Sequence, residues 1–556
     1  MAPKYAIGID FGTESGRAVL VDVATGEEKA TAVHRYANGV IDEALPDGKT
    51  KLAHDWALQD PADYIETMRK TIPAVLREGK AGPEAIIGVG IDFTACTMLP
   101  IDAEGAPLCQ HEAFRSTPNA WVKLWKHHAA QPEADLVNEV ARRRGERWLR
   151  RYGGKISSEW FFPKALQTLV EAPEVYRAAD RFLEGADWVV LQLCGEEKRN
   201  ACTAGYKAIW DKHEGYPSEE FFAELHPEFR TVVKDKLSTA IYPQGTRAGG
   251  LTKKLAKMTG LREGLSIAVA NVDAHVAVPA LTVVDEGKLA MIMGTSVCHL
   301  VLGKEMKFME GQCGVVEDGI IPGWMGFEAG QCAVGDIFAW FVEHCVPESH
   351  HAEARRRGIE LHALLEEKAS KLRPGETGLL ALDWHNGNRS VLVDAELSGL
   401  VLGLHLNTRA EEIYRALIES TAFGTYKIIR SFESAGVAAR ELYCCGGLAE
   451  RNELLMQTFS DVTGREMRVS ASGQTPALGS AMFASVAAGR AAGGYDTIEQ
   501  AAERMAKLSS RVYRPDGRRH ELYEKLYAEY ETLHDYFGRG TNDVMKRLRA
   551  LKSLSR

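Results

Sequence analysis

The first part of the chain places two apolar segments on either side of a short polar turn. Residues 5–11 are mostly apolar and reach an acidic residue, Asp10, near their end. The turn at 11–16 holds two glycines, a threonine and a serine, and residues 17–21 are again mainly apolar. Two apolar runs joined by such a turn predict a β-hairpin.

A second strand–turn–strand pattern occurs about halfway along the chain. Residues 287–293 are mainly apolar, 294–296 read Gly-Thr-Ser, and 297–302 are again mainly apolar. This recurrence predicts two related lobes that face each other. We expect an N-terminal lobe over residues 1–280 and a C-terminal lobe over 285–493.

Strand-like and helical patterns alternate through the rest of the chain, which is typical of an α/β fold. Buried-strand patterns occupy 86–92, 97–102, 266–270 and 441–445. Helical spacing occupies 63–76, 120–130, 162–170, 410–435, 452–462 and 477–490. The last stretch, 494–556, is charged and predicts a helical appendage. It could form a homodimer contact or pack on the second lobe, and both remain open.

The composition describes a large globular protein without a nucleic-acid or membrane partner. The 556 residues are 45% hydrophobic and 26% charged, with a net charge of −9. An acidic balance favours no nucleic-acid surface, and no apolar run reaches the roughly 18 residues of a membrane span. The ten cysteines are scattered without a CxxC pair, so we expect reduced thiols in a cytoplasmic protein.

The first turn carries groups suited to holding a polyphosphate. It offers a glycine and three residues with hydrogen-bond donors, namely Gly12, Thr13, Ser15 and Arg17. A glycine lets the backbone approach a ligand closely, and the donors can bind phosphate oxygens. Asp10, at the end of the strand, is placed to hold a hydrated Mg²⁺. An ordinary solvent-exposed hairpin is the alternative that this turn alone leaves open.

Asp273 follows the apolar strand at 266–270 and is a candidate general base. A carboxylate at a strand end near the junction of two lobes is well placed to accept a proton. Most aspartates at strand ends cap the next helix, and that role is the alternative. The turn formed by Gly294, Thr295 and Ser296 offers backbone N–H groups and two hydroxyls, and it is a second candidate for binding phosphate.

Two further segments are candidate binding sites, one for a flat ligand and one for a polyol. Gly446 and Gly447 join a strand to a helix and allow a flat ligand to lie against the backbone, and Asn452 can border its edge. An ordinary strand–helix turn is the alternative there. Lys207 and Glu328 lie among small and aromatic residues, a mixture that suits a polyol, although lone charged residues are more often on the surface.

Motifs of several other enzyme classes are absent from the sequence. There is no G-x-x-x-x-G-K-[ST] loop, no H-E-x-x-H and no G-x-S-x-G. Gly88-Val89-Gly90 lacks the third glycine of a dinucleotide-binding fingerprint. A strand–helix phosphate loop, a zinc protease and a serine hydrolase are therefore disfavoured.

The order of the motifs resembles the actin-like ATPases and, within them, the FGGY family of carbohydrate kinases. The matching motifs are D-x-G-T at 10–13, D-A at 273–274, G-T-S at 294–296 and G-G-x-x-x-x-N at 446–452. Longer stretches are similar to bacterial members that phosphorylate the pentulose L-ribulose, namely 8–18, 90–100, 121–134, 158–167 and 328–341. The resemblance extends over about the first 500 residues.

The resemblance implies a fold and a reaction. The fold would be α/β, with two actin-like (ribonuclease H-like) lobes facing a central cleft. The reaction would transfer phosphate from ATP, with Mg²⁺, to O5 of L-ribulose in L-arabinose catabolism. A kinase of another pentulose or a pentitol (D-ribulose, xylulose or ribitol) is an alternative, and an actin-like ATPase without a sugar substrate is a more distant one.

The resemblance also implies roles for individual residues. Asp273 would be the catalytic base, and Asp10 would be aimed at Mg²⁺. The phosphates would be surrounded by Gly12, Thr13, Ser15, Arg17, Gly294, Thr295 and Ser296, and adenosine would be bordered by Gly446, Gly447 and Asn452. The sugar would be lined by Ala95, Lys207, Asp273 and Glu328. Some family members carry hydroxyl side chains where this chain has Ala95-Cys96, so backbone groups would have to form the hydrogen bonds to the sugar there.

Overall fold

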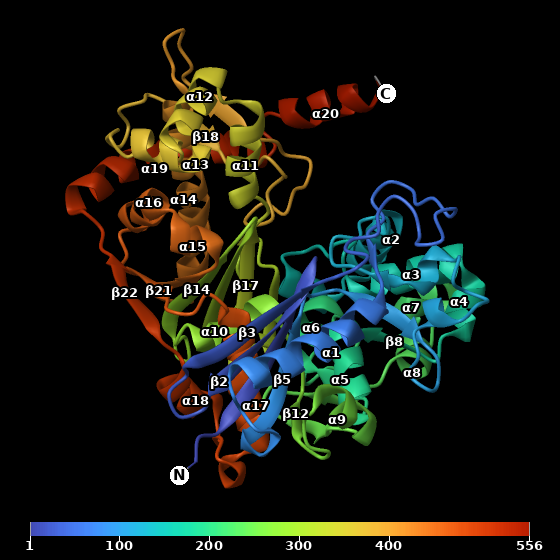
Figure 1. The fold of residues 1–556 in the computed structure, drawn as a ribbon. Helices are drawn as coiled ribbons and strands as arrows, with labels where there is room; N and C mark the ends of the chain where they lie inside the picture. The colour runs from blue at the N-terminus through green and yellow to red at the C-terminus, as the bar shows by residue number, and fades with distance from the viewer. Residues whose placement is uncertain (1, 555–556) are drawn as a thin grey trace.

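Two large mixed sheets form the centre of the molecule, as Figure 1 shows for the computed structural model of residues 2–554. The first sheet has the order β11-β12-β5-β1-β2-β3, with β13 beside β5. Its strands are β1 (Tyr5–Phe11), β2 (Ser15–Asp22), β3 (Glu28–Arg35), β5 (Ile86–Phe93), β11 (Arg247–Gly250), β12 (Ser266–Ala268) and β13 (Asn271–Val272). Because β1 is antiparallel to β2 and parallel to β5, the carboxyl ends of β1 and β5 lie side by side.

The second sheet repeats this arrangement. Its order is β16-β17-β15-β14-β20-β21-β22. Its strands are β14 (Gly287–Met293), β15 (Val297–Gly303), β16 (Gly314–Glu317), β17 (Met325–Gln331), β20 (Ala439–Cys445), β21 (Met467–Ser470) and β22 (Leu508–Tyr513). β14 pairs antiparallel with β15 and parallel with β20, as β1 pairs with β2 and β5. Both predicted hairpins are therefore confirmed, and each begins a sheet of the same design.

Two helices, α10 (Asp273–Ala280) and α17 (Thr475–Ala488), join the two sheets. Their apolar residues form one buried cluster with residues of both sheets. The backbone of α17 approaches the first sheet very closely, because a Cβ added at Gly8 would lie 1.8 Å from the Ala477 carbonyl oxygen. One added at Gly90 would lie 2.0 Å from the Ser480 carbonyl oxygen. Glycines in β1 and β5 thus admit a helix that comes from the far end of the chain.

A smaller sheet and several helices surround the first sheet. The smaller sheet has the order β4-β7-β6-β8, with β4 (Leu58–Gln59), β6 (Met98–Ile101), β7 (Val122–Lys123) and β8 (Arg181–Glu184). A short ladder pairs β9 (Arg199–Asn200) with β10 (Ile241–Tyr242). The helices are α1 (Pro61–Glu78), α2 (Gln131–Arg144), α3 (Phe161–Glu171), α4 (Pro173–Ala178), α5 (Gly185–Cys194), α6 (Ala201–Lys207), α7 (Glu219–Leu225), α8 (Val232–Lys236) and α9 (Lys253–Thr259).

The predicted helix at 120–130 is wrong. This segment holds β7 and a loop, because Lys123 pairs with Leu58 and Met98 in the smaller sheet. The side chain of Lys123 is buried in a polar cluster, where it donates hydrogen bonds to α3. Tertiary contacts therefore override the helical spacing of the neighbouring apolar residues.

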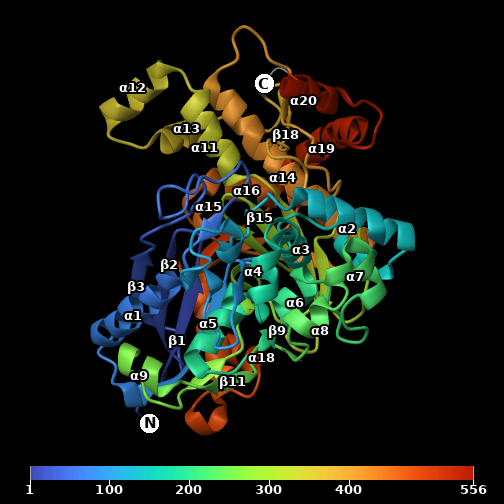
Figure 2. The same ribbon diagram turned by 90° about the vertical axis from the view of Figure 1, so that its right-hand side faces the viewer.

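Helices of the second half gather at the end of the molecule away from the N-terminus (Figure 2). They are α11 (Gly335–His344), α12 (Glu348–Arg357), α13 (Leu361–Ala369), α14 (Ala410–Ser434), α15 (Gly447–Arg451) and α16 (Glu453–Thr463), with the ladder of β18 (Leu380–Leu382) and β19 (Leu400–Leu402). None of the helices in residues 2–554 combines the length and the apolar character needed to cross a membrane.

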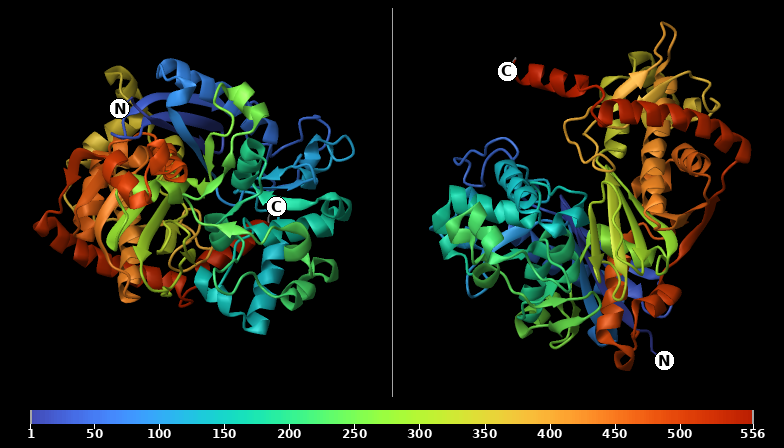
Figure 3. Two further views of the ribbon diagram at one scale, coloured as in Figure 1. Left: turned by 90° about the horizontal axis from the view of Figure 1, so that it is seen from below. Right: turned by 180° about the vertical axis from the view of Figure 1, so that it is seen from behind.

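The final segment, 494–556, is not entirely helical as predicted. It contains β22 besides α18 (Ile498–Met505), α19 (Gly517–Gly538) and α20 (Val544–Leu554). β22 forms because its backbone pairs with β21 at the edge of the second sheet. Tyr530 of α19 donates a hydrogen bond to Asp383, and Lys546 of α20 pairs with Asp394 at 2.6 Å, so both helices contact the second half of the chain. α20 lies at the outer edge of this part of the molecule in Figure 3. A homodimer contact through this tail stays a prediction.

Candidate active site

Two aspartates lie side by side where β1 and β5 end. Asp10 and Asp92 are register partners, and both side chains are buried. The two strands carry the same four residues, Gly-Ile-Asp-Phe, at 8–11 and 90–93, and Phe11 stacks on Phe93 with ring centroids 5.2 Å apart. Asp92 was not among the predicted site residues. The repeated tetrapeptide is the signal that could have identified it.

The surroundings of this pair raise the pKa values of both carboxyl groups. Burial raises the pKa of Asp10, and the Arg17 guanidinium, 3.5 Å away, opposes this. Burial raises the pKa of Asp92 well above its usual value, and the neighbouring Asp10 adds to it. Ser480 Oγ donates to Asp92 Oδ2 at 2.6 Å, whereas Asp92 Oδ1 is buried without a hydrogen-bond partner.

A hydrated Mg²⁺ fits this position. Mg²⁺ in phosphate sites takes one or two carboxylates and completes its shell with water and phosphate oxygens. The orphan oxygen of Asp92 beside Asp10 is the kind of group that such an ion would satisfy. Within residues 2–554 no three His, Cys, Asp or Glu side chains cluster closely enough to hold a metal by themselves. The site therefore suits a metal ion whose remaining ligands are water molecules and the phosphate oxygens of the nucleotide.

The first phosphate turn is held in place by contacts within the hairpin and by two contacts from outside it. Gly12 N–H donates to Ser15 O at 3.0 Å and closes the turn, and Arg17 Nη2 donates to Ser15 Oγ at 3.4 Å. Gln59 Nε2 donates to Thr13 O at 2.7 Å, and Trp125 Nε1 donates to Thr13 Oγ1 at 3.0 Å. Gln59 and Trp125 were not predicted, because nothing local in the sequence links them to residue 13.

The second phosphate turn is built in the same way. Gly294 N–H donates to Ser296 O at 2.9 Å, and Val334 N–H donates to Thr295 O at 2.8 Å. Gly446 has a φ of +100°, and an added Cβ there would lie 2.4 Å from Met293 O, the last residue of β14. The Gly446 turn thus lies directly against the strand that leads into the second phosphate turn.

The other predicted adenosine residues follow Gly446 along the chain. Gly447 begins α15, and Asn452 separates α15 from α16. Asn452 Oδ1 accepts a hydrogen bond from Leu455 N–H at 2.8 Å, which caps α16. The side-chain oxygen of Asn452 is therefore occupied, and its amide nitrogen makes a long hydrogen bond of 3.5 Å to the Tyr414 hydroxyl.

Asp273 begins α10 and has the electrostatic character of a general base. Its Oδ1 accepts a hydrogen bond from Ala274 N–H at 2.6 Å, whereas the helix cap position belongs to Val272. Burial, reinforced by Asp10, raises the pKa of Asp273 to about 7. Lys207 and Glu328 also contribute to this pKa. His275, two residues after Asp273 in α10, lies 3.4 Å from Glu328, which in turn lies 3.1 Å from Lys207.

Glu328 of β17 is the centre of a buried charge network between the two halves of the chain. Lys207 Nζ lies 3.1 Å from Glu328 Oε2, and His275 Nε2 lies 3.4 Å from the same atom. Arg389 Nη2 donates to Glu328 Oε1. Burial raises the pKa of Glu328, but Lys207, His275 and Arg389 outweigh it, and the pKa falls well below its usual value. His275 and Arg389 were missed by the sequence analysis, since Arg389 lies in a loop without a motif.

Ala95 lies in a tight turn between β5 and β6. It is partly exposed, while Cys96 beside it is buried and has a φ of +61°, in the left-handed region. Burial raises the pKa of Cys96 to about 12, and the Lys207 and Lys164 ammonium groups oppose this. The turn therefore lies near Lys207, on the sugar side of the predicted site.

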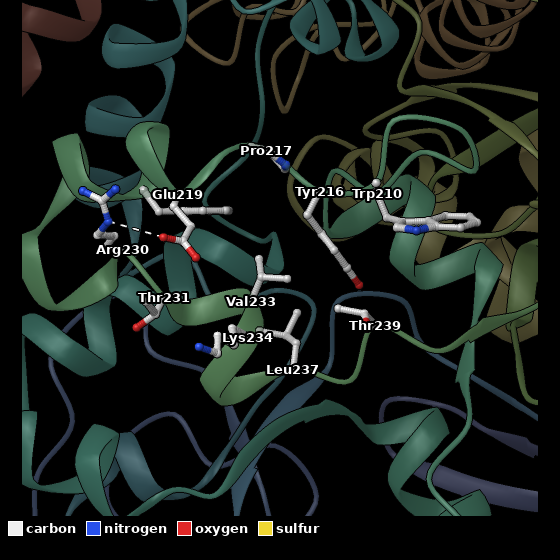
Figure 4. Close-up of a pocket in the computed structure, with 12 residues that line it drawn as sticks. Trp210, Tyr216, Pro217, Glu219, Arg230, Thr231, Val233, Lys234, Leu237 and Thr239 are labelled. Atoms are coloured by element: carbon white, nitrogen blue, oxygen red, sulfur yellow. Dashed lines mark hydrogen bonds and ion pairs between the residues drawn. The ribbon is translucent and has the colours of Figure 1, made fainter.

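Two cavities lie apart from the predicted residues. The one in Figure 4 has a volume of about 440 Å³ and is lined by Trp210, Tyr216 and Arg230 among others, with Glu219 paired to Arg230. None of the predicted site residues lines it. A second cavity of about 600 Å³ is lined by Trp340 and His385 among others, and the predicted adenosine residues do not line it.

The chain matches one family of enzymes over most of its length. Residues 5–279 match the N-terminal domain of the FGGY family of carbohydrate kinases, and residues 289–488 match its C-terminal domain. A protein named ribulokinase from Halalkalibacterium halodurans is 59% identical over 554 residues, covering 100% of this chain and 98% of that protein. One of the same name from Geobacillus thermodenitrificans is 58% identical over 556 residues, covering 100% and 98%.

A solved structure agrees with this result at the level of the fold. The xylulose kinase from Rhodospirillum rubrum superposes with a TM-score of 0.77 at 20% identity, covering 96% of this chain and 98% of that one. The predicted fold class, two actin-like lobes, is confirmed. The match to both FGGY domains and the full-length relatives named ribulokinase show that the protein is an ATP-dependent sugar kinase. The chain belongs to the FGGY family of carbohydrate kinases.

Proposed function

We propose that the protein transfers the γ-phosphoryl group of ATP to O5 of L-ribulose, yielding L-ribulose 5-phosphate in L-arabinose catabolism. The observation that carries the proposal is the position of Asp273. Its pKa responds to Asp10 on the phosphate side and to Lys207 and Glu328 on the sugar side. The full-length identity to proteins named ribulokinase supports L-ribulose over other acceptors.

Asp273 acts as the general base. It accepts the proton of the sugar hydroxyl as that oxygen attacks the γ-phosphorus, and ADP leaves. A pKa of about 7 suits a base that works near neutral pH, and such proton transfer is worth about 10²–10⁴ in rate. The carboxylate needs no activating partner, because burial and the nearby Asp10 already raise its basicity.

The two turns bind the phosphates. Backbone N–H groups and hydroxyls of Thr13, Ser15, Thr295 and Ser296 donate to phosphate oxygens, and the Arg17 guanidinium adds positive charge. Asp10, with Asp92 beside it, would hold Mg²⁺, which offsets the charge on the phosphate oxygens when it is bound. Gly446, Gly447 and Asn452 border adenosine next to the second turn.

The sugar is oriented by groups of both lobes. Lys207 and Arg389 are fixed by Glu328 and direct their remaining donors to sugar hydroxyls, and Ala95 presents backbone groups. Fixing the inner hydroxyls from several directions leaves the terminal one facing Asp273. Ten free cysteines support a reducing compartment, so we place the protein in the cytoplasm.

A sugar panel tests the proposal. Coupled ADP release with Mg·ATP is measured against L-ribulose, D-ribulose, L-xylulose, D-xylulose, ribitol, L-arabitol and glycerol. We expect the highest kcat/KM with L-ribulose. A clear preference for another pentulose or a pentitol would contradict L-ribulose as the substrate but would still agree with a sugar kinase. ATP hydrolysis that ignores every sugar would overturn the proposed function as a whole.

A further inference from the structure

The ammonium group of Lys164 occupies an unusual place in this protein. Lys164 lies in α3 with none of its surface exposed to solvent. Its Nζ donates to the carbonyl oxygens of Cys96 and Leu124, both at 2.7 Å. In the part of the chain that the structure describes it forms no ion pair with a carboxylate. A lysine buried against two backbone carbonyls needs an explanation, because burying its charge is costly.

The first of these carbonyls belongs to the turn that faces the sugar. Cys96 directly follows Ala95 and has a φ of +61°, a conformation that residues other than glycine adopt at an energetic cost. The hydroxyl groups of Thr94 and Thr97 lie 2.8 Å apart and close the turn. The Lys164 ammonium donates to the carbonyl of Cys96 itself, the residue in the left-handed conformation.

The second carbonyl leads to the first phosphate turn. Leu124 directly precedes Trp125, whose indole N–H donates to Thr13 Oγ1 at 3.0 Å. The Leu124 backbone is also fixed from the other side, because its N–H donates to Ala57 O at 2.9 Å. One ammonium group therefore joins the sugar-facing turn to the segment that holds Thr13.

We propose that Lys164 is a positioning residue that sets the sugar-facing turn at Ala95 relative to the first phosphate turn. This inference rests on the proposed function, since it gives Ala95 the sugar contact. Lys164 itself does not touch the sugar. It holds the carbonyls of Cys96 and Leu124 at a fixed separation, and this keeps the sugar and the phosphates correctly placed relative to each other.

Lys123 provides a matched control. It is also a buried lysine, and it donates to Lys164 O at 2.9 Å, to Gln167 at 2.8 Å and to Thr168 at 2.9 Å. Burial lowers the pKa of both lysines, to about 7 for Lys123 and about 8 for Lys164. The two therefore share burial, charge and cluster, but Lys123 donates to neither the Cys96 nor the Leu124 carbonyl.

The test compares Lys164→Met, Lys164→Arg and Lys123→Met with the wild type, first by melting and then by kinetics. KM is measured for L-ribulose and for ATP, together with the ratio of kcat/KM between L-ribulose and the next best sugar. We expect Lys164→Met to raise the sugar KM about tenfold, the value of one lost positioned hydrogen bond, and to lower the sugar ratio. The ATP KM should change by less than about threefold.

Lys164→Arg keeps the charge but places it on a larger planar group, so we expect a folded protein with the same selective rise in the sugar KM. Lys123→Met should leave both KM values within about threefold, even if its melting temperature falls. Equal changes in both KM values, or the same sugar defect in Lys123→Met, would overturn the proposal.

If both Lys164 variants fail to fold while Lys123→Met folds, Lys164 serves folding and the proposal is also overturned. A wild type that turns over no sugar would instead defeat the proposed function, before any variant is compared.

Discussion

Ser480 Oγ donates a hydrogen bond of 2.6 Å to Asp92 Oδ2, although the two residues are 388 positions apart. Asp92 lies one residue before the end of β5 in the first sheet, and Ser480 lies in α17, which comes from the far end of the chain. This bond ties the pair of aspartates to the helix that both sheets share. The orientation of Asp92 in the first sheet therefore depends on Ser480, which follows the central strands of the second sheet in the sequence.

Ser480→Ala should reduce stability and turnover together. It leaves a buried carboxyl group without its donor, which costs about 1–3 kcal/mol. It also frees Asp92 to rotate beside Asp10, so we expect kcat to fall. Ser485→Ala is the matched control, because Ser485 is buried on the same helix and donates only within it and to a methionine sulfur. Urea unfolding and kcat are measured for both; a kcat loss of the same size in Ser485→Ala would contradict the account.

Gly90→Ala should separate α17 from the first sheet. The new Cβ would meet the Ser480 carbonyl oxygen at 2.0 Å, and because this atom belongs to the backbone, α17 or β5 must shift as a whole. Overpacking of this kind costs about 1–3 kcal/mol or more. Gly82→Ala is the control, because an added Cβ there meets no atom within 4 Å. Denaturant midpoints compare the two variants, and equal midpoints would disprove the close approach of α17.

Asp273→Asn should abolish the base and stabilise the protein. We expect kcat to fall by about 10²–10⁴ or more, with both KM values retained. Folding raises the pKa of Asp273 from 3.8 to about 7, so its favourable contribution to stability is present below pH 3.8 and is lost as pH rises through about 7. At pH 8 the asparagine variant should therefore melt above the wild type. Retained turnover would remove Asp273 from its role.

The activity of the wild type should rise with pH, whereas the contribution of Asp273 to stability falls. The base must be unprotonated to accept a proton, so kcat/KM should rise with pH through about 7 and then level off. A rate profile from about pH 5.5 to about pH 8.5 is measured with Asp273→Asn as the control, whose residual rate should lack this step. A wild-type profile that is flat over this range would show that Asp273 does not limit the rate.

Glu328→Gln should expose the cost of the buried charge network. It leaves the buried Lys207 ammonium and the partly exposed Arg389 guanidinium without their shared anion, and breaking the buried Lys207 pair from one side costs about 3–5 kcal/mol. The sugar KM should rise as well. Glu317→Gln removes a partner of Lys212 near the surface and should cost at most about 1 kcal/mol. Thermal and urea unfolding compare the two, and similar losses would argue that the Glu328 network is not a tightly coupled buried site.

Local patterns were enough to predict the elements that build the site. The two hairpins follow from apolar runs and small polar turns, since this signal lies within about twenty residues of sequence. Asp10 and Asp273 were recognisable because each stands at the end of an apolar strand. Their proposed roles came from the family resemblance, and the structure adds the shared electrostatics around them.

The supporting residues could not be predicted, because their partners are distant in sequence. Lys123 and Lys164 have the sequence character of surface residues, but both are buried where α3, which carries Lys164, packs against the segment that carries Lys123. The helix predicted at 120–130 is wrong for the same reason. Arg389 reaches Glu328 from a loop without regular pattern. Only Asp92 had a visible signal, the second copy of Gly-Ile-Asp-Phe.

The identity and position of the phosphorylated hydroxyl test the central claim most directly. After turnover of L-ribulose with Mg·ATP, the product is examined by ¹³C NMR for splitting by phosphorus. The account predicts splitting at C5 and C4, as in L-ribulose 5-phosphate, and its loss when Asp273→Asn replaces the wild type. Splitting at C1 and C2, or the appearance of inorganic phosphate without a sugar ester, would contradict it.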